Sequence, residues 1–234
     1  MKWLLNQFLT KDFILTLEDA LRSEALKAHQ IVKDHSGLKC PKRARGGEGQ
    51  MRFRMMEERF EDICRLYGGV PLISGIIPNT DLKIFQPFMR FEIEGRGIIF
   101  GLAAMPEPAT LPTKNKSRKA AVSLNYHLEP RFAFDKISPQ IGDIFVSLLV
   151  ARDRERAGHI EEIAIGIINS KHDGFVFYEP LEQFLRDYDV DTPDPVSPTP
   201  PTPASGVTLK KVSSVYIPPE NLTSDQENEQ GTGS

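Results

Sequence analysis

The sequence predicts an α+β fold in which N-terminal helices pack on a mostly antiparallel β-sheet, followed by a disordered C-terminal tail. Three observations predict it. Before Pro71, apolar residues recur at the spacing of amphipathic helices. After Pro71, short apolar runs rich in Ile, Val and Phe are separated by Gly, Pro and Asn, without the regular helix–strand alternation of a doubly wound nucleotide-binding fold. From residue 187 onwards, Pro, Thr, Ser and acidic residues dominate the composition.

Two helices are expected in the first part of the domain, at residues 16–36 and 50–67. Both have apolar side chains three and four positions apart; the first ends at Gly37 and the second before Pro71. The apolar faces consist of Leu17, Leu21, Ala25, Ala28 and Val32 in the first helix, and of Phe53, Met56, Phe60, Ile63, Cys64 and Tyr67 in the second. The glycine-rich segment 46–49 lacks the preceding strand of a phosphate-binding loop, so we expect a flexible joint there.

The sheet is expected over about residues 72–178, and a short helix at 181–188 closes a single domain of residues 1–186. Its clearest feature is a hairpin of residues 88–94 and 98–104, because glycines at the turn supply positive φ. The turn of this hairpin is expected at residues 95–97, and further strands at 120–128, 144–151, 160–168 and 175–178. Residues 145–150 and 163–168 are apolar at nearly every position, which predicts that both faces of these two strands are covered.

Composition indicates an ordinary folded protein. The chain has 234 residues, of which 40% are hydrophobic, and its two cysteines, Cys40 and Cys64, give no disulfide framework. No apolar run approaches the roughly 18 residues that a membrane span needs. The opening segment, residues 1–9, is too short and too interrupted for a signal peptide. We therefore expect a cytoplasmic protein that has no membrane partner.

The tail, residues 187–234, differs from the domain in charge as well as in composition. It contains eight acidic and two basic residues, a net charge of −6, which leaves 27 basic and 24 acidic residues in the domain. The mildly acidic whole chain therefore contains a mildly basic folded part. Within the tail, Val215, Tyr216 and Ile217 form an apolar island that is expected to bind a protein partner, the alternative being an inert tail.

Recognisable catalytic motifs are absent. The sequence contains no Gly-Lys-Ser/Thr phosphate loop, no Gly-x-Ser-x-Gly elbow, no His-Glu-x-x-His and no Cys-x-x-Cys. His29, His35, Cys40 and Cys64 lack the short regular spacing of structural zinc sites. We therefore expect no cofactor and no metal, and the sequence favours a non-enzymatic protein.

The polar segment 152–162 allows two interpretations. Four of its side chains could serve a metal-dependent hydrolase or nuclease: Asp153, Glu155, His159 and Glu161. The alternative is a solvated hairpin tip, in which the period of two along an extended strand places Arg152, Arg154 and Arg156 on one face. The second interpretation is favoured, because a catalytic site usually draws on several segments of the chain.

Two segments are rich in basic residues. The candidate nucleic-acid-binding residues are Lys39, Lys42, Arg43, Arg45, Arg52 and Arg54 in the first segment, and Lys114, Lys116, Arg118 and Lys119 in the second. Both segments contain Gly, Pro, Ser or Asn, and flexible basic loops suit contacts with phosphates. The alternative is that these are ordinary solvated Lys and Arg side chains.

These observations lead to a hypothesis about function. The sequence predicts a binding or adaptor protein within a larger assembly, which contacts nucleic acid non-specifically through loops 33–54 and 114–119. The hypothesis requires the two loops, which are distant in the sequence, to come together in space. A second hypothesis is a protein–protein interaction subunit that binds no nucleic acid.

Overall fold

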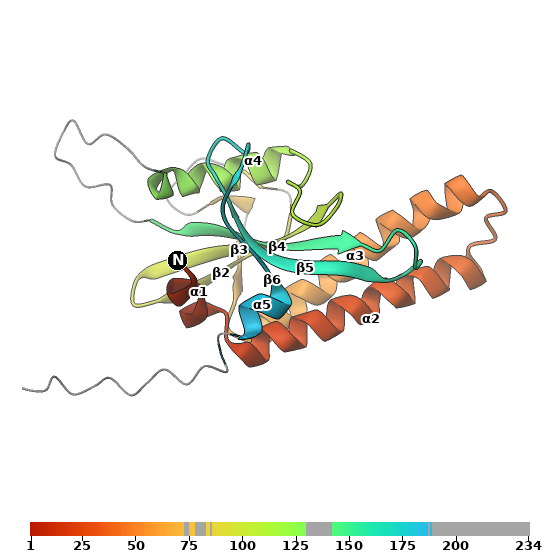
Figure 1. The fold of residues 1–234 in the computed structure, drawn as a ribbon, viewed down its shortest axis with the longest axis horizontal. Coiled ribbons are helices and arrows are strands. Elements are labelled where there is room, and N and C mark those ends of the chain that lie inside the picture. Colours follow the sequence, from red (N-terminus) through yellow and green to blue (C-terminus); the bar gives the residue numbers. More distant parts are fainter. Residues whose placement is uncertain (73–74, 78–82, 85, 130–141, 187, 189–234) are drawn as a thin grey trace, which may run out of the picture. The chain divides into compact units, whose positions relative to one another are not determined.

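Figure 1 shows the fold in a computed structural model, which describes residues 1–72, 75–77, 83–84, 86–129, 142–186 and 188. These residues belong to the first of two units of the chain, Met1–Asp191. The predicted tail lies outside the described residues, apart from Tyr188. The helices are α1 (Lys2–Phe8), α2 (Lys11–His35), α3 (Pro41–Leu66), α4 (Lys116–Val122), the 3₁₀ helix η2 (Ser123–Leu128) and α5 (Leu181–Arg186). The strands are β1 (Val70–Pro71), β2 (Phe88–Ile93), β3 (Arg96–Met105), β4 (Ile144–Arg152), β5 (Ile160–Ile168) and β6 (Phe175–Pro180). In this part of the chain, no helix combines the length and the apolarity that crossing a membrane requires.

Both predicted N-terminal helices are present, and both begin earlier than predicted. α2 starts after Thr10, whose Oγ1 accepts a hydrogen bond from a backbone amide of the first turn at 3.3 Å. α3 starts at Pro41, a residue that the first turn of a helix tolerates, and it includes residues 46–49. The predicted joint is therefore wrong. Tertiary contacts outweigh the low helix propensity of the glycines, since His29 Nδ1 of α2 lies 3.0 Å from Glu48 Oε2 of α3.

The sheet is mixed and has six strands in the order β1-β2-β3-β4-β5-β6. All neighbours are antiparallel except β3 and β4, which run parallel from the pair Ile98↔Ile144 to the pair Met105↔Ala151. The α+β class and the mostly antiparallel pairing are thus confirmed. The predicted strand at 120–128 is wrong, because α4 and η2 occupy these residues. A parallel neighbour needs a crossover connection, and these helices are part of it.

The main core lies between one face of the sheet and helices α2 and α3. Side chains alternate along each central strand, so Ile98, Phe100 and Leu102 of β3 face these helices. Phe100 connects the layers: its ring centroid lies 5.3 Å from that of Phe60 in α3 and 6.1 Å from that of Phe13 in α2. The buried residues of this core also include Leu5 and Phe8 of α1, a helix too short to be predicted from periodicity, and Cys64, which has no disulfide partner.

The opposite face of the sheet is covered by α4 and η2, and Figure 1 shows α4 on the other side from α2 and α3. Phe88 of β2 and Phe145 of β4 pack beneath this layer with their rings tilted by 48° and their centroids 5.0 Å apart. Asn125 of η2 is fully buried: its Nδ2 donates to the Phe145 and Ile168 carbonyls at 3.0 and 2.8 Å, and its Oδ1 accepts from the Phe145 amide at 2.8 Å. The coverage of both faces, predicted from the apolar runs, is confirmed.

The hairpin of β2 and β3 is confirmed, with a different turn from the predicted one. Ile93 pairs with Arg96, so Glu94 and Gly95 form a two-residue turn. Their φ values are +50° and +77°, and two positive values are what a type I′ turn requires. Gly97 therefore lies within β3, opposite Glu92, and its role is to leave space rather than to turn the chain.

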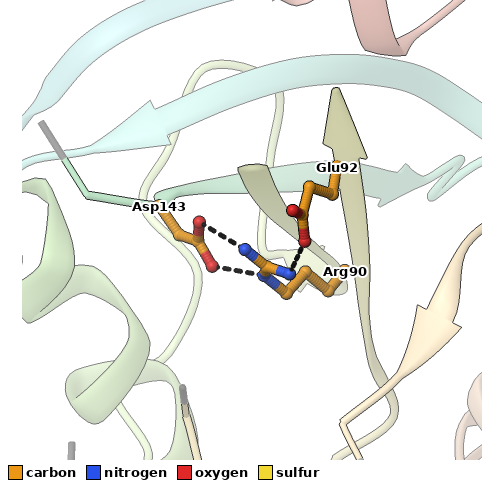
Figure 2. A network of polar contacts seen from close by, with 3 residues as sticks. All are labelled: Arg90, Glu92 and Asp143. Atoms are coloured by element: carbon orange, nitrogen blue, oxygen red, sulfur yellow. Dashed lines mark hydrogen bonds and ion pairs between the residues drawn. The ribbon is translucent and has the colours of Figure 1, made fainter. Parts of the chain in front are cut away.

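A network of polar contacts joins β2 to the residue before β4 (Figure 2). Arg90 of β2 donates from Nε and Nη2 to the two carboxylate oxygens of Asp143, at 2.6 and 3.2 Å, and from Nη1 to Glu92. These bonds, with those to Asp143 first, raise the pKa of the Arg90 guanidinium above its usual range. Asp143 directly precedes β4, so the network attaches the start of β4 to β2 across the intervening strand. A Cβ at Gly97 would lie 2.6 Å from Asp143 Oδ1.

We expect Gly97→Ala to destabilise the fold by about 1–3 kcal/mol, because the new methyl group overlaps the Asp143 carboxylate. The cost should shrink in an Asp143→Ala background, where the overlapping atom is missing. Urea denaturation of the wild type, both single variants and the double variant measures this coupling. Additive costs in the double variant would contradict the assigned role of Gly97.

Candidate cationic cleft

A cleft of about 1470 Å³ opens where the carboxyl ends of β3 and β4 meet. Its sheet side is lined by Ala104 and Met105 at the end of β3, by Pro106 after them, and by Val150 and Arg152 of β4. In the first half of α3, residues 45–47 and 49–58 form one wall; Thr113 and residues 115–117, at the start of α4, form the other. Parallel strands present their carboxyl ends at one edge, and the crevice outside these ends is a common place for ligands to bind.

Six basic side chains from three separate segments line this cleft, which we call the cationic cleft. They are Arg45, Arg52 and Arg54 from α3, Lys116 from α4, and Arg152 and Arg154 from the end of β4 and the residues after it. The structure thus brings part of each predicted basic segment to one site, together with two arginines of the polar segment 152–162. The lining acidic residues are Glu57 and Glu58.

Two of the six cations are paired with carboxylates. Arg54 Nη1 lies 2.9 Å from Glu57 Oε2, and Arg154 Nη2 lies 2.6 Å from Glu107 Oε1. The other four, Arg45, Arg52, Lys116 and Arg152, form no ion pair and no side-chain hydrogen bond with the residues that the structure describes. The cleft therefore holds an excess of positive charge.

Arg52 and Arg152 bring like charges close together. The side chain of Arg52 is half-buried, and its pKa is lowered chiefly by burial. The charge of Glu48 raises this pKa and the charge of Arg152 lowers it further. An arginine keeps its proton in proteins, so Arg52 stays charged and the folded state bears the free-energy cost of its burial and of its repulsion by Arg152. An anion between the two guanidinium groups would reduce that cost.

A chain of polar contacts connects the two walls of the cleft. From Arg54 it passes through Glu57, which is 5% exposed, to Gln86, whose Nε2 lies 3.5 Å from Glu57 Oε1. Asn115 Nδ2 then donates to Gln86 Oε1 at 3.1 Å. Asn115 is also the N-cap of α4, accepting from the Arg118 amide at 2.7 Å. These contacts fix the position of Lys116, the next residue, relative to α3.

The connection from β3 to α4 is held in place at three further points. The Ala109 amide donates to Tyr178 Oη at 2.8 Å, and His172 Nε2 donates to the Pro112 carbonyl at 3.1 Å. Arg118 Nη1 donates to the Thr113 carbonyl. Because this connection forms part of the cleft wall, the wall is preorganised by residues of β6, of the β5–β6 turn and of α4.

The side chain of Arg118 is not accessible in the way that the predicted contact with phosphates requires. Its side chain is 5% exposed, and burial lowers its pKa to about 10. It donates within its own connection instead of facing solvent, and we describe it as a positioning residue. Lys114 and Lys119 are exposed beside Lys116 without lining the cleft.

The rest of the predicted site residues lie elsewhere. Lys39, Lys42 and Arg43 are exposed at the connection between α2 and α3 and in the first turn of α3, outside the cleft. The predicted partner-binding residues Val215, Tyr216 and Ile217 lie outside the described residues. Part of the basic surface therefore does not belong to the cationic cleft.

The polar segment 152–162 forms the connection between β4 and β5. Asp153 Oδ1 accepts from the amides of Glu155 and Arg156, each at 2.9 Å, and its Oδ2 accepts from Arg156 Nε at 2.7 Å. These bonds, led by the Arg156 amide, lower the pKa of Asp153 to about 2. Glu155, His159 and Glu161 are exposed. Nowhere in the described ranges do three His, Cys, Asp or Glu side chains gather closely enough to hold a metal ion.

Sequence reasoning missed Glu57, Gln86 and Asn115. Neither Glu57, a buried glutamate in an amphipathic helix, nor Gln86, a glutamine between strands, has a sequence pattern around it that indicates a functional position. Asn115 does have one, since asparagine directly before Lys116–Val122 is a helix N-cap pattern. Recognising that cap would also have replaced the predicted strand at 120–128 by a helix.

No protein-family model, no curated protein and no solved structure matches this chain. What the cationic cleft can bind therefore follows from its own geometry and charge.

We expect His172 to make the stability of the fold depend on pH. Burial is the main cause that lowers the pKa of His172, and the charges of Arg118 and Lys114 lower it further. The hydrogen bond to the Pro112 carbonyl acts in the opposite direction and raises this pKa. Below about pH 6.5 the unfolded chain binds a proton at this residue that the folded chain resists, so stability falls as the pH falls. His172→Asn, which suits the φ of +55° and does not titrate, should have a shallower decline in melting temperature between about pH 7 and pH 5.

Thermal denaturation followed by circular dichroism at these two pH values tests this expectation. An equally steep decline in the variant would show that other groups cause the pH dependence.

Proposed function

We propose that the cationic cleft binds the phosphate backbone of a nucleic acid without reading its sequence. The observation that supports this proposal is the convergence of Arg45, Arg52, Lys116 and Arg152, which no described carboxylate pairs, on both walls of one cleft. Guanidinium and ammonium groups are the usual partners of phosphate oxygens. Phosphate contacts position a protein on nucleic acid and carry no sequence information by themselves.

The dimensions of the cleft favour a polymer over a small anion. Its volume of about 1470 Å³ exceeds the roughly 300–1,000 Å³ of typical small-molecule pockets. The cations come from α3, from α4 and from the end of β4, so they are distributed around the cleft instead of focused on one point. A chain with regularly spaced phosphates can contact several of them at once.

The proposed role is that of a non-enzymatic binding or adaptor protein within a larger assembly. The net charge of −6 in residues 187–234 contrasts with the excess of basic residues in the domain. In this proposal, Val215, Tyr216 and Ile217 recruit a protein partner, while the acidic residues around them compete with polyanions for the basic surface.

We expect Arg52→Gln/Arg152→Gln to weaken binding of a labelled DNA duplex and to flatten its salt dependence. With four phosphate contacts, log K should fall with log salt at a slope of roughly −3 to −4, and the double variant should reduce the slope by about 2. Fluorescence anisotropy at a series of NaCl concentrations measures both quantities.

Lys42→Gln/Arg43→Gln is the matched control, since it removes the same charge from an exposed part of α3 outside the cleft. We expect it to change affinity and slope less than the cleft variant does. Equal effects of the two double variants would mean that binding follows overall charge and that the cleft is not the site. The proposal would be overturned if the wild type showed no salt-dependent binding of either a duplex or a single-stranded oligonucleotide.

A further inference from the structure

The cationic cleft has an apolar floor as well as a basic rim. Met56, Met105, Val150 and Ile160 line it and are each at most 5% exposed. Phe53 of α3 adds a half-buried aromatic ring beside Arg52 and Arg54. Protein already covers these four side chains, so the apolar surface that a ligand can cover belongs to Phe53 and Met55, which are half-buried, and to Met51, which is 37% exposed.

The charged groups lie above this floor. Arg45, Arg54, Lys116 and Arg152 are exposed, and Arg52 is half-buried between rim and floor. A ligand that complements both parts of the cleft therefore presents anionic groups to the rim and apolar surface to the floor.

A duplex and a single strand differ in this respect. A duplex presents its phosphates outwards and keeps the faces of its bases stacked inside, so it can contact the rim but leaves the floor uncovered. A single strand has free base faces, which stack on aromatic and apolar side chains while the backbone follows a basic groove.

We infer that the cleft takes single-stranded polynucleotide, with its phosphates on the basic rim and its bases against Phe53 and the methionine-rich floor. This inference rests on the proposed function and specifies the ligand of the same site. Stacking is tolerant of sequence because every base has an aromatic face, so it agrees with non-specific phosphate contacts. Phe53 is then a ligand-contacting residue, whereas Gln86 and Asn115 fix the position of one wall relative to the other through their mutual hydrogen bond.

The test uses the full chain and one mixed-sequence oligonucleotide of about 16 nucleotides, as single-stranded DNA, as single-stranded RNA and annealed as a DNA duplex. Fluorescence anisotropy at one fixed low salt concentration gives the three affinities. We expect at least one single strand to bind roughly tenfold more tightly than the duplex, because it gains the stacking contacts. The DNA and RNA arms show whether the 2′-hydroxyl contributes.

Phe53→Ala should weaken single-strand binding by roughly tenfold and leave duplex binding unchanged. Phe53 also packs against the core, so Phe53→Leu serves as a second variant that retains apolar volume and removes the aromatic face. Thermal denaturation verifies that each variant is folded. Trp3→Ala is the matched control, since Trp3 is 73% exposed on α1 and does not line the cleft.

The outcomes separate the two claims. Equal binding of duplex and single strands, or tighter binding of the duplex, overturns the single-strand inference, and so does unchanged binding in a folded Phe53→Leu variant. In any of these cases the proposed function still stands if Arg52→Gln/Arg152→Gln weakens the binding of the oligonucleotides that the wild type binds. If no oligonucleotide binds, both are overturned.

Discussion

The parallel pairing of β3 and β4 is the constraint on which the rest of the architecture depends. Two adjacent strands that run in the same direction need a connection that leaves the carboxyl end of the first strand and returns to the amino end of the second. Here that connection includes α4 and η2, which cover the face of the sheet opposite α2 and α3. The carboxyl ends of both strands consequently lie at one edge, beside the first half of α3, and the cleft opens there.

The arginines of this protein show that residue type alone does not define a binding site. Arg90 is bound by two oxygens of Asp143 and by Glu92, so its charge is neutralised and contributes to the fold (Figure 2). Arg52 and Arg152 have the same chemistry but no paired carboxylate among the described residues. Their two positive charges repel each other, which the lowered pKa of Arg52 reflects. The difference lies in what surrounds each guanidinium, which only the folded chain determines.

The sequence predicted those features that depend on local periodicity. The apolar faces of α2 and α3, the hairpin of β2 and β3 and the run of β4, β5 and β6 follow from spacings within single segments. The wrong predictions concern segments whose conformation depends on distant residues. Residues 120–128 are apolar enough for a strand, yet Asn115 caps α4, which ends at Val122 and is followed directly by η2. Likewise, the exposure of Arg118 could not be predicted, because its partner is the Thr113 carbonyl of a folded connection. Which basic residues share a cleft depends on the parallel pairing, for which the sequence offers no local signal.

Glu48 shows how the glycine-rich part of α3 serves the cleft. Gly46, Gly47 and Gly49 each make a helix about 1 kcal/mol less favourable than alanine would, so this part of α3 needs contacts with α2. Glu48 provides one by contacting His29 at 3.0 Å. It lies one turn before Arg52, where an ion pair between the two side chains would be expected, and its charge does raise the Arg52 pKa. Because its carboxylate contacts His29 instead, the same contact that stabilises the wall of the cleft also leaves Arg52 without a paired carboxylate.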